Sequence, residues 1–156
     1  MSPAELGKKL EERFPEHYLG QREDRGEWTF WVDRAAWVEA ARYLSVEHGY
    51  NFLSDLTAVD YLDRDPRFDL SAILLSWQGK SDLRLKTLIP EADPRADTLT
   101  GVWAGANWYE REIFDMFGIE FDNHPALMRL LLPPDYVGHP LRKDYPVTGP
   151  ADSPYR

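Results

Sequence analysis

The stretch that decides the fold is FDLSAILLSWQGKSDLRLKTLI, residues 68–89. It starts by alternating and becomes solidly apolar at Ile73, Leu74 and Leu75, which is typical of a strand covered on both faces. Residues 82–89 alternate, so their apolar side chains face one way. The short polar run at 78–81 contains a glycine and predicts a hairpin connection. The stretch therefore predicts two paired strands in a sheet.

Further elements are predicted on either side of this hairpin. Residues 27–32 and 51–61 have the pattern of two more strands, and helices are expected at 3–14, 34–48 and about 106–117. Asp33 is the expected N-cap of the second helix, and Gly49 and Gly118 end the second and third. Because helices and strands do not alternate regularly, we expect an α+β fold. It would be a two-layer α/β domain with a mixed sheet of about five strands and helices on one face.

The chain changes character after residue 118. Seven of the 12 prolines lie in residues 119–156, so long regular elements are not expected there. We therefore divide the chain into an α+β domain, residues 1–118, and an extended proline-rich tail, residues 119–156. The tail would pack on the domain or on a partner subunit.

Composition excludes several classes of function. The net charge of -9 argues against binding to nucleic acid. The chain has no cysteine, which excludes disulfides, thiolate zinc sites and cysteine-ligated iron–sulfur clusters on this chain. No stretch approaches the ~20 apolar residues of a spanning helix. Association with a membrane is therefore expected only through protein partners.

One carboxylate stands out in the third predicted helix. On a helical wheel of residues 108–117, Arg111, Glu112 and Asp115 lie opposite an apolar arc, and Arg111 and Asp115 could form an exposed ion pair. Glu110 falls inside the apolar arc. It either reaches water at the edge of the arc or needs a buried partner.

We hypothesise that Glu110 forms a buried ion pair or hydrogen-bond hub with a basic residue of the tail. The candidates are Arg129, Arg142 and Lys143. Such a contact would pin the tail to the helix.

Other polar residues suggest chemistry only weakly. His124 and His139 match no metal-ligand spacing, and the His-Pro steps predict turns in which the imidazole caps backbone groups. Asp55 and Asp60 are five apart on a predicted strand, so they should face opposite sides rather than act as a general acid/base pair. Hydrogen bonding at the strand end is the expected role of both.

Three blocks of sequence stand out: Asn51-Phe52-Leu53 with Asp55 and Asp60-Tyr61; Glu110-Arg111-Glu112 with Asp115, Met116-Phe117, His124 and Leu130-Leu131; and Gly138-His139-Pro140-Leu141-Arg142-Lys143-Asp144-Tyr145-Pro146. Together these blocks resemble the C subunit of NADH–quinone oxidoreductase (respiratory complex I). The resemblance covers about residues 50–147, and at one position of the pattern, usually Arg, Lys or Pro, this chain has Met128.

This resemblance implies a non-catalytic subunit of the peripheral arm, on the cytoplasmic side of the cell membrane. Its partners would be the subunits that hold the terminal iron–sulfur cluster and form the quinone pocket. The assembly transfers electrons from NADH to a quinone and translocates protons. NADH, flavin, iron–sulfur clusters and quinone are expected on partner subunits, with no cofactor, metal or catalytic residue on this chain. The implied structural or interface residues are Glu110, Arg111, Glu112, Asp115, His124, Arg129, His139, Arg142 and Lys143.

Three alternative functions make different experimental predictions. The nearest alternative is the equivalent subunit of a membrane-bound hydrogenase or a related energy-converting complex, which partner identification would separate. A free-standing enzyme with an acid–histidine site would show activity in isolation. A nucleic-acid module would bind RNA or DNA in a salt-dependent way.

Overall fold

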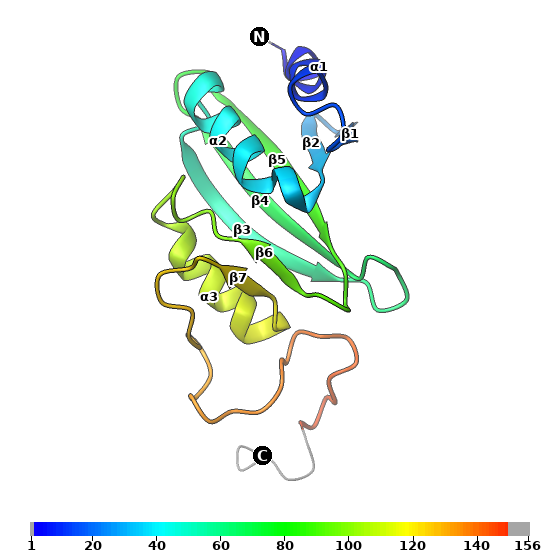
Figure 1. Ribbon diagram of the computed structural model, residues 1–156, viewed down its shortest axis with the longest axis vertical. Helices are drawn as coiled ribbons and strands as arrows, with labels where there is room; N and C mark the ends of the chain where they lie inside the picture. The colour runs from blue at the N-terminus through cyan, green and yellow to red at the C-terminus, as the bar shows by residue number, and fades with distance from the viewer. Residues whose placement is uncertain (1, 150–156) are drawn as a thin grey trace.

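The computed structural model describes residues 2–149 and shows a mixed sheet with helices, which confirms the predicted α+β class (Figure 1). Five strands form one sheet in the order β1-β2-β5-β4-β3. Strands β2 and β5 run parallel and the other neighbours run antiparallel. Strands β6 and β7 form a separate parallel pair. The elements are α1 (Pro3–Arg13), β1 (Tyr18–Asp24), β2 (Glu27–Val32), the 3-10 helix η1 (Arg34–Ala36), α2 (Trp37–His48), β3 (Phe52–Asp60), β4 (Phe68–Ser76), β5 (Ser81–Ile89), β6 (Arg95–Asp97), α3 (Ala106–Phe117) and β7 (Glu120–Asp122).

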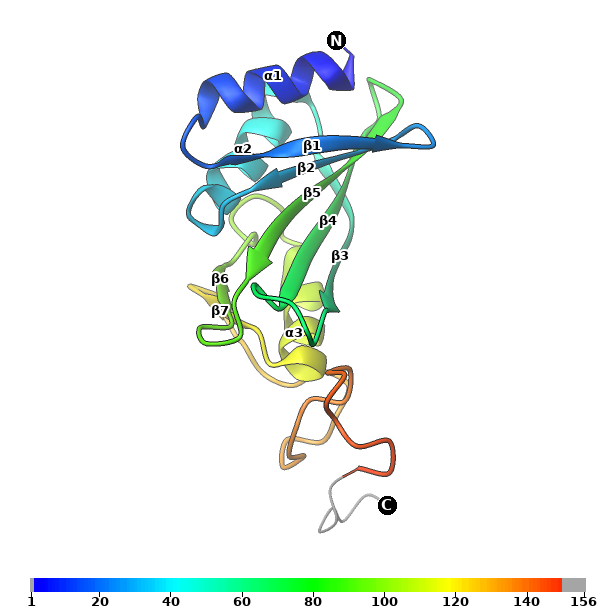
Figure 2. The ribbon, with the colours of Figure 1, turned by 90° about the vertical axis from the view of Figure 1, so that its right-hand side faces the viewer.

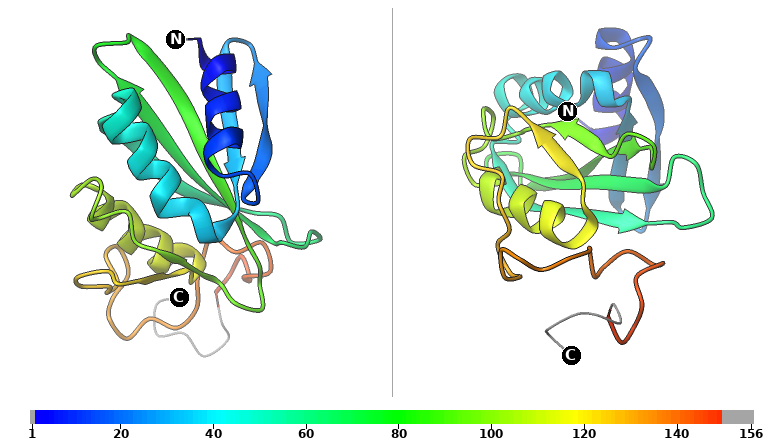
Figure 3. Two further views of the ribbon diagram at one scale, coloured as in Figure 1. Left: turned by 45° about the horizontal axis from the view of Figure 1, so that its top comes forward. Right: turned by 60° about the horizontal axis from the view of Figure 1, so that its bottom comes forward.

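The core lies between one face of the sheet and the helices (Figures 2 and 3). Strand β4 contributes Leu70 and Leu74 and helix α2 contributes Trp37, all with no exposed surface. Ile113 brings helix α3 into the same cluster. Full burial of one such side chain stabilises the fold by about 1.5–3 kcal/mol, so this layer is the main source of stability.

The two predicted glycine ends are confirmed, and Asp33 caps a short 3-10 helix that leads into α2. The Asp33 side chain accepts a hydrogen bond from the Ala35 N–H at 2.8 Å, and the chain starts there with a turn of 3-10 helix before α2. Gly49 and Gly118 end α2 and α3 in the left-handed conformation, with φ of 75° and 72°. Glycine adopts this conformation without the steric cost that a Cβ brings.

Three strands were not expected from the sequence. Strand β1 is an exposed edge strand with a polar stretch, so it lacks the alternation that marks a half-buried strand. Strands β6 and β7 have three residues each, too few to show a period.

The proline-rich tail begins inside the domain and continues beneath α3 (Figure 1). Ile119 and Phe121 are buried in the core, and residues 123–149 form no helix or strand. The last part of the predicted tail, residues 150–156, lies outside the described residues. Within residues 2–149, no helix combines the length and hydropathy needed to cross a membrane.

Candidate functional site: the tail clamped to helix α3

Helix α3 presents two buried carboxylates, Glu110 and Asp115, and both have 0% exposed surface. The helix packs on β3, where the Tyr109 hydroxyl donates to the Ser54 carbonyl at 2.9 Å. Burial of Glu110 agrees with its place in the apolar arc. Burial of Asp115 does not agree with the wheel, because the tail covers the polar side of the helix.

Asp115 is the main anchor of the tail. Its Oδ1 accepts from Nη1 of Arg129 at 2.6 Å. Its Oδ2 accepts from three consecutive backbone N–H groups, those of Leu130, Leu131 and Leu132, at 3.1, 2.8 and 2.9 Å. A charged acceptor with four donors is strongly held. The predicted exposed pair between Arg111 and Asp115 is therefore wrong.

The surroundings of Asp115 favour its charged form. Burial opposes ionisation, but the three N–H donors and Arg129 outweigh it and keep the pKa of Asp115 below its usual value. Arg129 also donates to the carbonyl of Gly138 at 3.2 Å, so one guanidinium links α3 to two parts of the tail.

The block at residues 138–146 caps the C-terminus of α3. The last four carbonyls of a helix have no partner inside it and must find donors elsewhere. One is satisfied by the glycine that ends α3, and three by tail residues. The contacts are Gly118 N–H to Phe114 O at 2.9 Å, His139 Nδ1 to Asp115 O at 3.0 Å, Leu141 N–H to Met116 O at 3.1 Å and Arg142 Nε to Phe117 O at 2.6 Å.

Two glycines make this close approach possible. A Cβ on Gly118 would lie 2.6 Å from the ring of His139, and one on Gly138 would lie 2.6 Å from the ring of Tyr145. Both residues also have positive φ. The two glycines are therefore required by contact as well as by backbone conformation.

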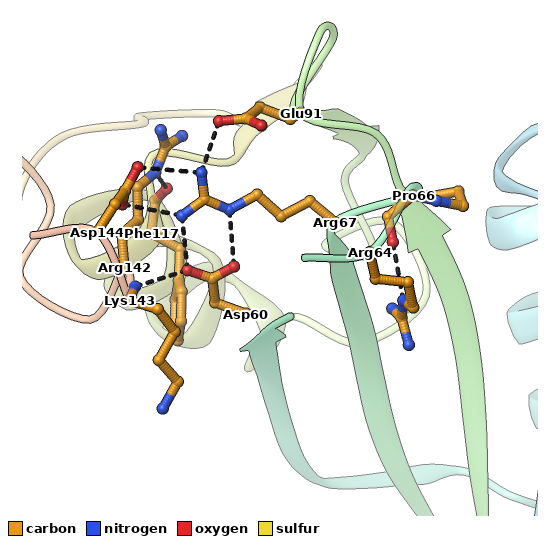
Figure 4. A network of polar contacts seen from close by, with 9 residues as sticks. All are labelled: Asp60, Arg64, Pro66, Arg67, Glu91, Phe117, Arg142, Lys143 and Asp144. Atoms are coloured by element: carbon orange, nitrogen blue, oxygen red, sulfur yellow. Dashed lines mark hydrogen bonds and ion pairs between the residues drawn. The ribbon is translucent and has the colours of Figure 1, made fainter. Parts of the chain in front are cut away.

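The contacts of Asp115 with residues 129–132 form one clamp on the tail. A second clamp is centred on Arg67, which is 1% exposed (Figure 4). Its Nε and Nη2 form a fork on Asp60 at 2.7 and 2.8 Å, while Nη2 and Nη1 reach Asp144 of the tail at 2.8 and 3.2 Å. Nη1 also donates to Glu91 at 2.6 Å. The Lys143 N–H donates to Oδ2 of Asp60 at 2.7 Å. All five guanidinium donors are used, so the tail is tied to the ends of β3 and β5.

The Arg67 clamp shifts the titration of its members. The hydrogen bonds from Arg67 lower the pKa of both Asp60 and Asp144, and those from Asp60 and Asp144 raise the pKa of Arg67. The ion pairs thus favour the charged form of every partner.

The residues that bind Asp115 and Arg67 lie within a segment that matches a known protein family. A protein-family model described as "Respiratory-chain NADH dehydrogenase, 30 Kd subunit" matches residues 30–151. The chain belongs to this family. The expected resemblance to complex I is confirmed: the chain is a subunit of NADH–quinone oxidoreductase, and the hydrogenase alternative is not favoured.

Individual relatives agree with the family. The C subunit of NADH-quinone oxidoreductase from Citrifermentans bemidjiense is 49% identical over 95% of this chain and 92% of its own. A protein of Methylococcus capsulatus, named as a C/D subunit of the same enzyme, is 42% identical over 90% of this chain and 25% of its own length. Among solved structures, a trypsin-resistant fragment of Nqo5 is similar with a TM-score of 0.68 and 33% identity. It covers 78% of this chain and 98% of the fragment.

In this member of the 30 kDa subunit family, Glu110 contacts none of Arg129, Arg142 and Lys143, so the predicted ion pair with one of them is wrong. Its carboxylate accepts from the Leu99 N–H at 2.6 Å and the Thr98 hydroxyl at 2.5 Å, and His124 Nε2 lies 3.7 Å away.

The two histidines cap backbone groups, as predicted. His124 Nδ1 accepts from the Ala126 N–H at 3.0 Å, and His139 packs against Phe114 while binding the Asp115 carbonyl. Burial lowers the pKa of His139, which favours the neutral ring. Within residues 2–149, no group of three or more His, Asp or Glu side chains is placed to hold a metal ion.

The remaining predicted interface residues, Arg111 and Glu112, lie at the surface of α3. Arg111 donates to the carbonyls of Met128 and Arg129 at 3.2 and 3.3 Å, and its guanidinium lies 4.9 Å from the Trp108 ring centroid. Glu112 is exposed. Arg111 therefore joins an exposed tryptophan to the tail.

Sequence reasoning missed Arg67, although it is the centre of one clamp. Asp55 and Asp60 do face opposite sides of the sheet, since Asp55 pairs with Ile73 and Asp60 with Phe68 across β4. Asp60 ends its strand with hydrogen bonds, as expected. The sequence did hold one sign of the partner of Asp60: a charged residue, Arg67, lies directly before the apolar strand β4.

Proposed function

We propose that this subunit is a non-catalytic scaffold of the peripheral arm on the cytoplasmic side of the membrane. It would bind the subunits that form the terminal iron–sulfur cluster and the quinone pocket. NADH, flavin, iron–sulfur clusters and quinone would be held by those partners, and the assembly would couple electron transfer to proton translocation.

The observation that carries this proposal is an exposed apolar surface built on the clamped tail. Trp108, Met128 and Leu131 are 60%, 56% and 62% exposed. Trp108 lies on α3, and Arg111 and Asp115 fix the tail backbone that presents Met128 and Leu131. Exposed apolar groups on a rigid support are typical of a protein-binding surface, and tryptophan often contributes most to binding there.

The relative with the combined C/D name supports one particular partner. This chain matches 25% of the length of that protein. A region similar to this chain is therefore joined there to further sequence in a single polypeptide that is named a C/D subunit. We infer direct contact between this subunit and a D-type subunit. The lack of cysteine supports the assignment of iron–sulfur clusters to partners.

Purification of the tagged chain from detergent-solubilised membranes tests the proposal. Trp108→Ala and Leu131→Ala should each reduce recovery of the D-type subunit at least ~10-fold, because each removes an anchor of the surface. Leu19→Ala is the matched control: Leu19 is 52% exposed on β1, at the sheet edge opposite to β3. Equal recovery with all three variants would contradict the assignment.

A second measurement tests the absence of chemistry on this chain. The purified chain should show no flavin or iron absorbance and no NADH–quinone turnover. A bound flavin, or turnover by the chain alone, would refute the scaffold role.

A further inference from the structure

The carboxylate of Glu110 is sealed from solvent and has only neutral hydrogen-bond donors. Its Oε1 accepts from the Leu99 N–H and its Oε2 from the Thr98 hydroxyl. No lysine or arginine nitrogen within residues 2–149 lies within 4.0 Å of it. A buried carboxylate without a cation is expected to favour its neutral form.

The threonines beside Glu110 can satisfy both of its protonation states. Thr98 Oγ1 lies 2.9 Å from Thr100 Oγ1 and accepts from the Thr100 N–H at 3.1 Å. When Glu110 is charged, the Thr98 hydroxyl donates to it. When Glu110 is protonated, the acid donates to Thr98, whose own hydrogen turns toward Thr100. Both threonines are partly exposed, so the hydroxyl chain leads from the buried acid toward solvent.

The hydrogen bond that His124 donates depends on the charge of Glu110. Because the Ala126 amide can only donate, Nδ1 of His124 is an acceptor and the ring proton is on Nε2. Nε2 lies 3.2 Å from the Asn107 carbonyl and 3.7 Å from Glu110 Oε2. A charged Glu110 would draw this N–H away from the carbonyl.

We propose that Glu110 is a buried proton-binding site, filled from solvent through Thr98 and Thr100, whose occupancy sets the hydrogen bond of His124 at the start of the tail. The site is independent of the scaffold role proposed above. Its ligand is the proton alone.

The charged groups nearby are engaged elsewhere. On the β6 side, Asp97 accepts from Asn123, and on β7, Asp122 accepts from Arg95. On α3 itself, Arg111 donates to tail carbonyls and Glu112 faces solvent. Among the basic side chains of residues 2–149, His124 is the one that lies within 4.0 Å of Glu110. Burial raises the pKa of Glu110 to about 7, against the opposing hydrogen bonds from Thr98 and Leu99.

Carbon-13 NMR titration of the glutamate carboxyl groups in the full chain tests the proposal. The signal that Glu110→Gln removes should have its midpoint near pH 7, and the His124 ring should shift with the same midpoint. Thr98→Val, which keeps the shape and removes the hydroxyl, should move both midpoints upward. Glu112→Gln should leave both unchanged. A Glu110 midpoint below about pH 5 would overturn the proposal.

The melting temperature gives an independent readout. The folded chain binds this proton more tightly than the unfolded chain, whose glutamate pKa is near 4.5, so stability should fall as pH rises from there to about 7. Glu110→Gln imitates the neutral acid, so the stability of this variant should not show that decrease with pH. Its melting temperature relative to the native chain should therefore increase between about pH 5 and pH 8. A constant difference would overturn the proposal, and if Glu110→Gln does not fold, Thr98→Val still decides through its titration.

Discussion

At the scale of single residues, Glu110 and Asp115 show how neighbours decide the charge of a buried acid. Both lie on α3 with no exposed surface. Glu110 has two neutral donors, and burial raises its pKa to about 7. Asp115 has three backbone donors and a guanidinium, and these outweigh burial and lower its pKa. Two acids of similar burial thus have opposite roles: one holds a proton and the other holds the tail.

Asp115→Asn should release the tail from α3. The amide has no charge for Arg129, and its NH2 group cannot accept from the N–H donors, so a partly buried guanidinium loses its counter-charge. We expect the free energy of unfolding to fall by about 3 kcal/mol, measured by urea denaturation. Glu112→Gln, on the exposed side of the same helix, should change it by less than about 0.5 kcal/mol. A loss below about 1 kcal/mol for Asp115→Asn would show that Asp115 is not the anchor.

Arg67→Lys should loosen the second clamp without removing its charge. A lysine ammonium cannot form the fork that Arg67 makes with Asp60 while it also reaches Asp144. The Lys143 amide, which donates to Asp60, should exchange its hydrogen at least ~10-fold faster. Arg22→Lys, on the exposed strand β1, is the control and should leave this amide unchanged. Unchanged exchange in both variants would argue against a role for the fork.

Sequence reasoning at this scale found the buried acid but not its partners. The helical wheel placed Glu110 correctly because the wheel depends only on spacing along one helix. It placed Asp115 on the open side because it cannot include a tail that returns from residues 128–146. Arg67 was missed because its partners Asp60 and Asp144 lie 7 and 77 residues away, and only the fold brings them together.

At the scale of elements, long periodic segments were predicted well. The strand at 27–32 and the helix at 106–117 are confirmed at both ends. Strand β1 was missed because an exposed edge strand needs no apolar face. The pair β6–β7 was missed because its order depends on residues far apart in the chain.

Gly118→Ala tests whether the end of α3 needs glycine. The residue has φ of 72°, and an added Cβ would lie 2.6 Å from the His139 ring. The conformational cost alone is about 1–2 kcal/mol, and displacement of His139 adds to it, so the free energy of unfolding should fall by at least ~2 kcal/mol. Gly101→Ala is the matched control, since nothing lies within 4 Å of a Cβ there. Equal stability of the two variants would show that the tail tolerates a shift of its cap.

At the scale of the whole molecule, helix α3 and the tail satisfy each other's polar groups. The tail supplies donors to the last turn, a counter-charge to Asp115 and a backbone N–H to Asp60, and in return the domain fixes its path. This mutual dependence explains why residues without regular structure keep a defined position. The predicted division at residue 118 describes where regular elements become rare, while the core continues through Phe121.

Acid should detach the tail before it unfolds the sheet. The pKa values of Asp115, Asp60 and Asp144 are all lowered in the folded chain. The ion pairs and hydrogen bonds of both clamps are therefore fully formed above about pH 4. They are lost as the pH falls through the lowered pKa values of the folded chain. Hydrogen exchange at decreasing pH, corrected for intrinsic rates, should show amide 143 and amides 130–132 losing protection before those of β4. Simultaneous loss in tail and sheet would mean that the carboxylates stabilise the whole fold and do not control the tail.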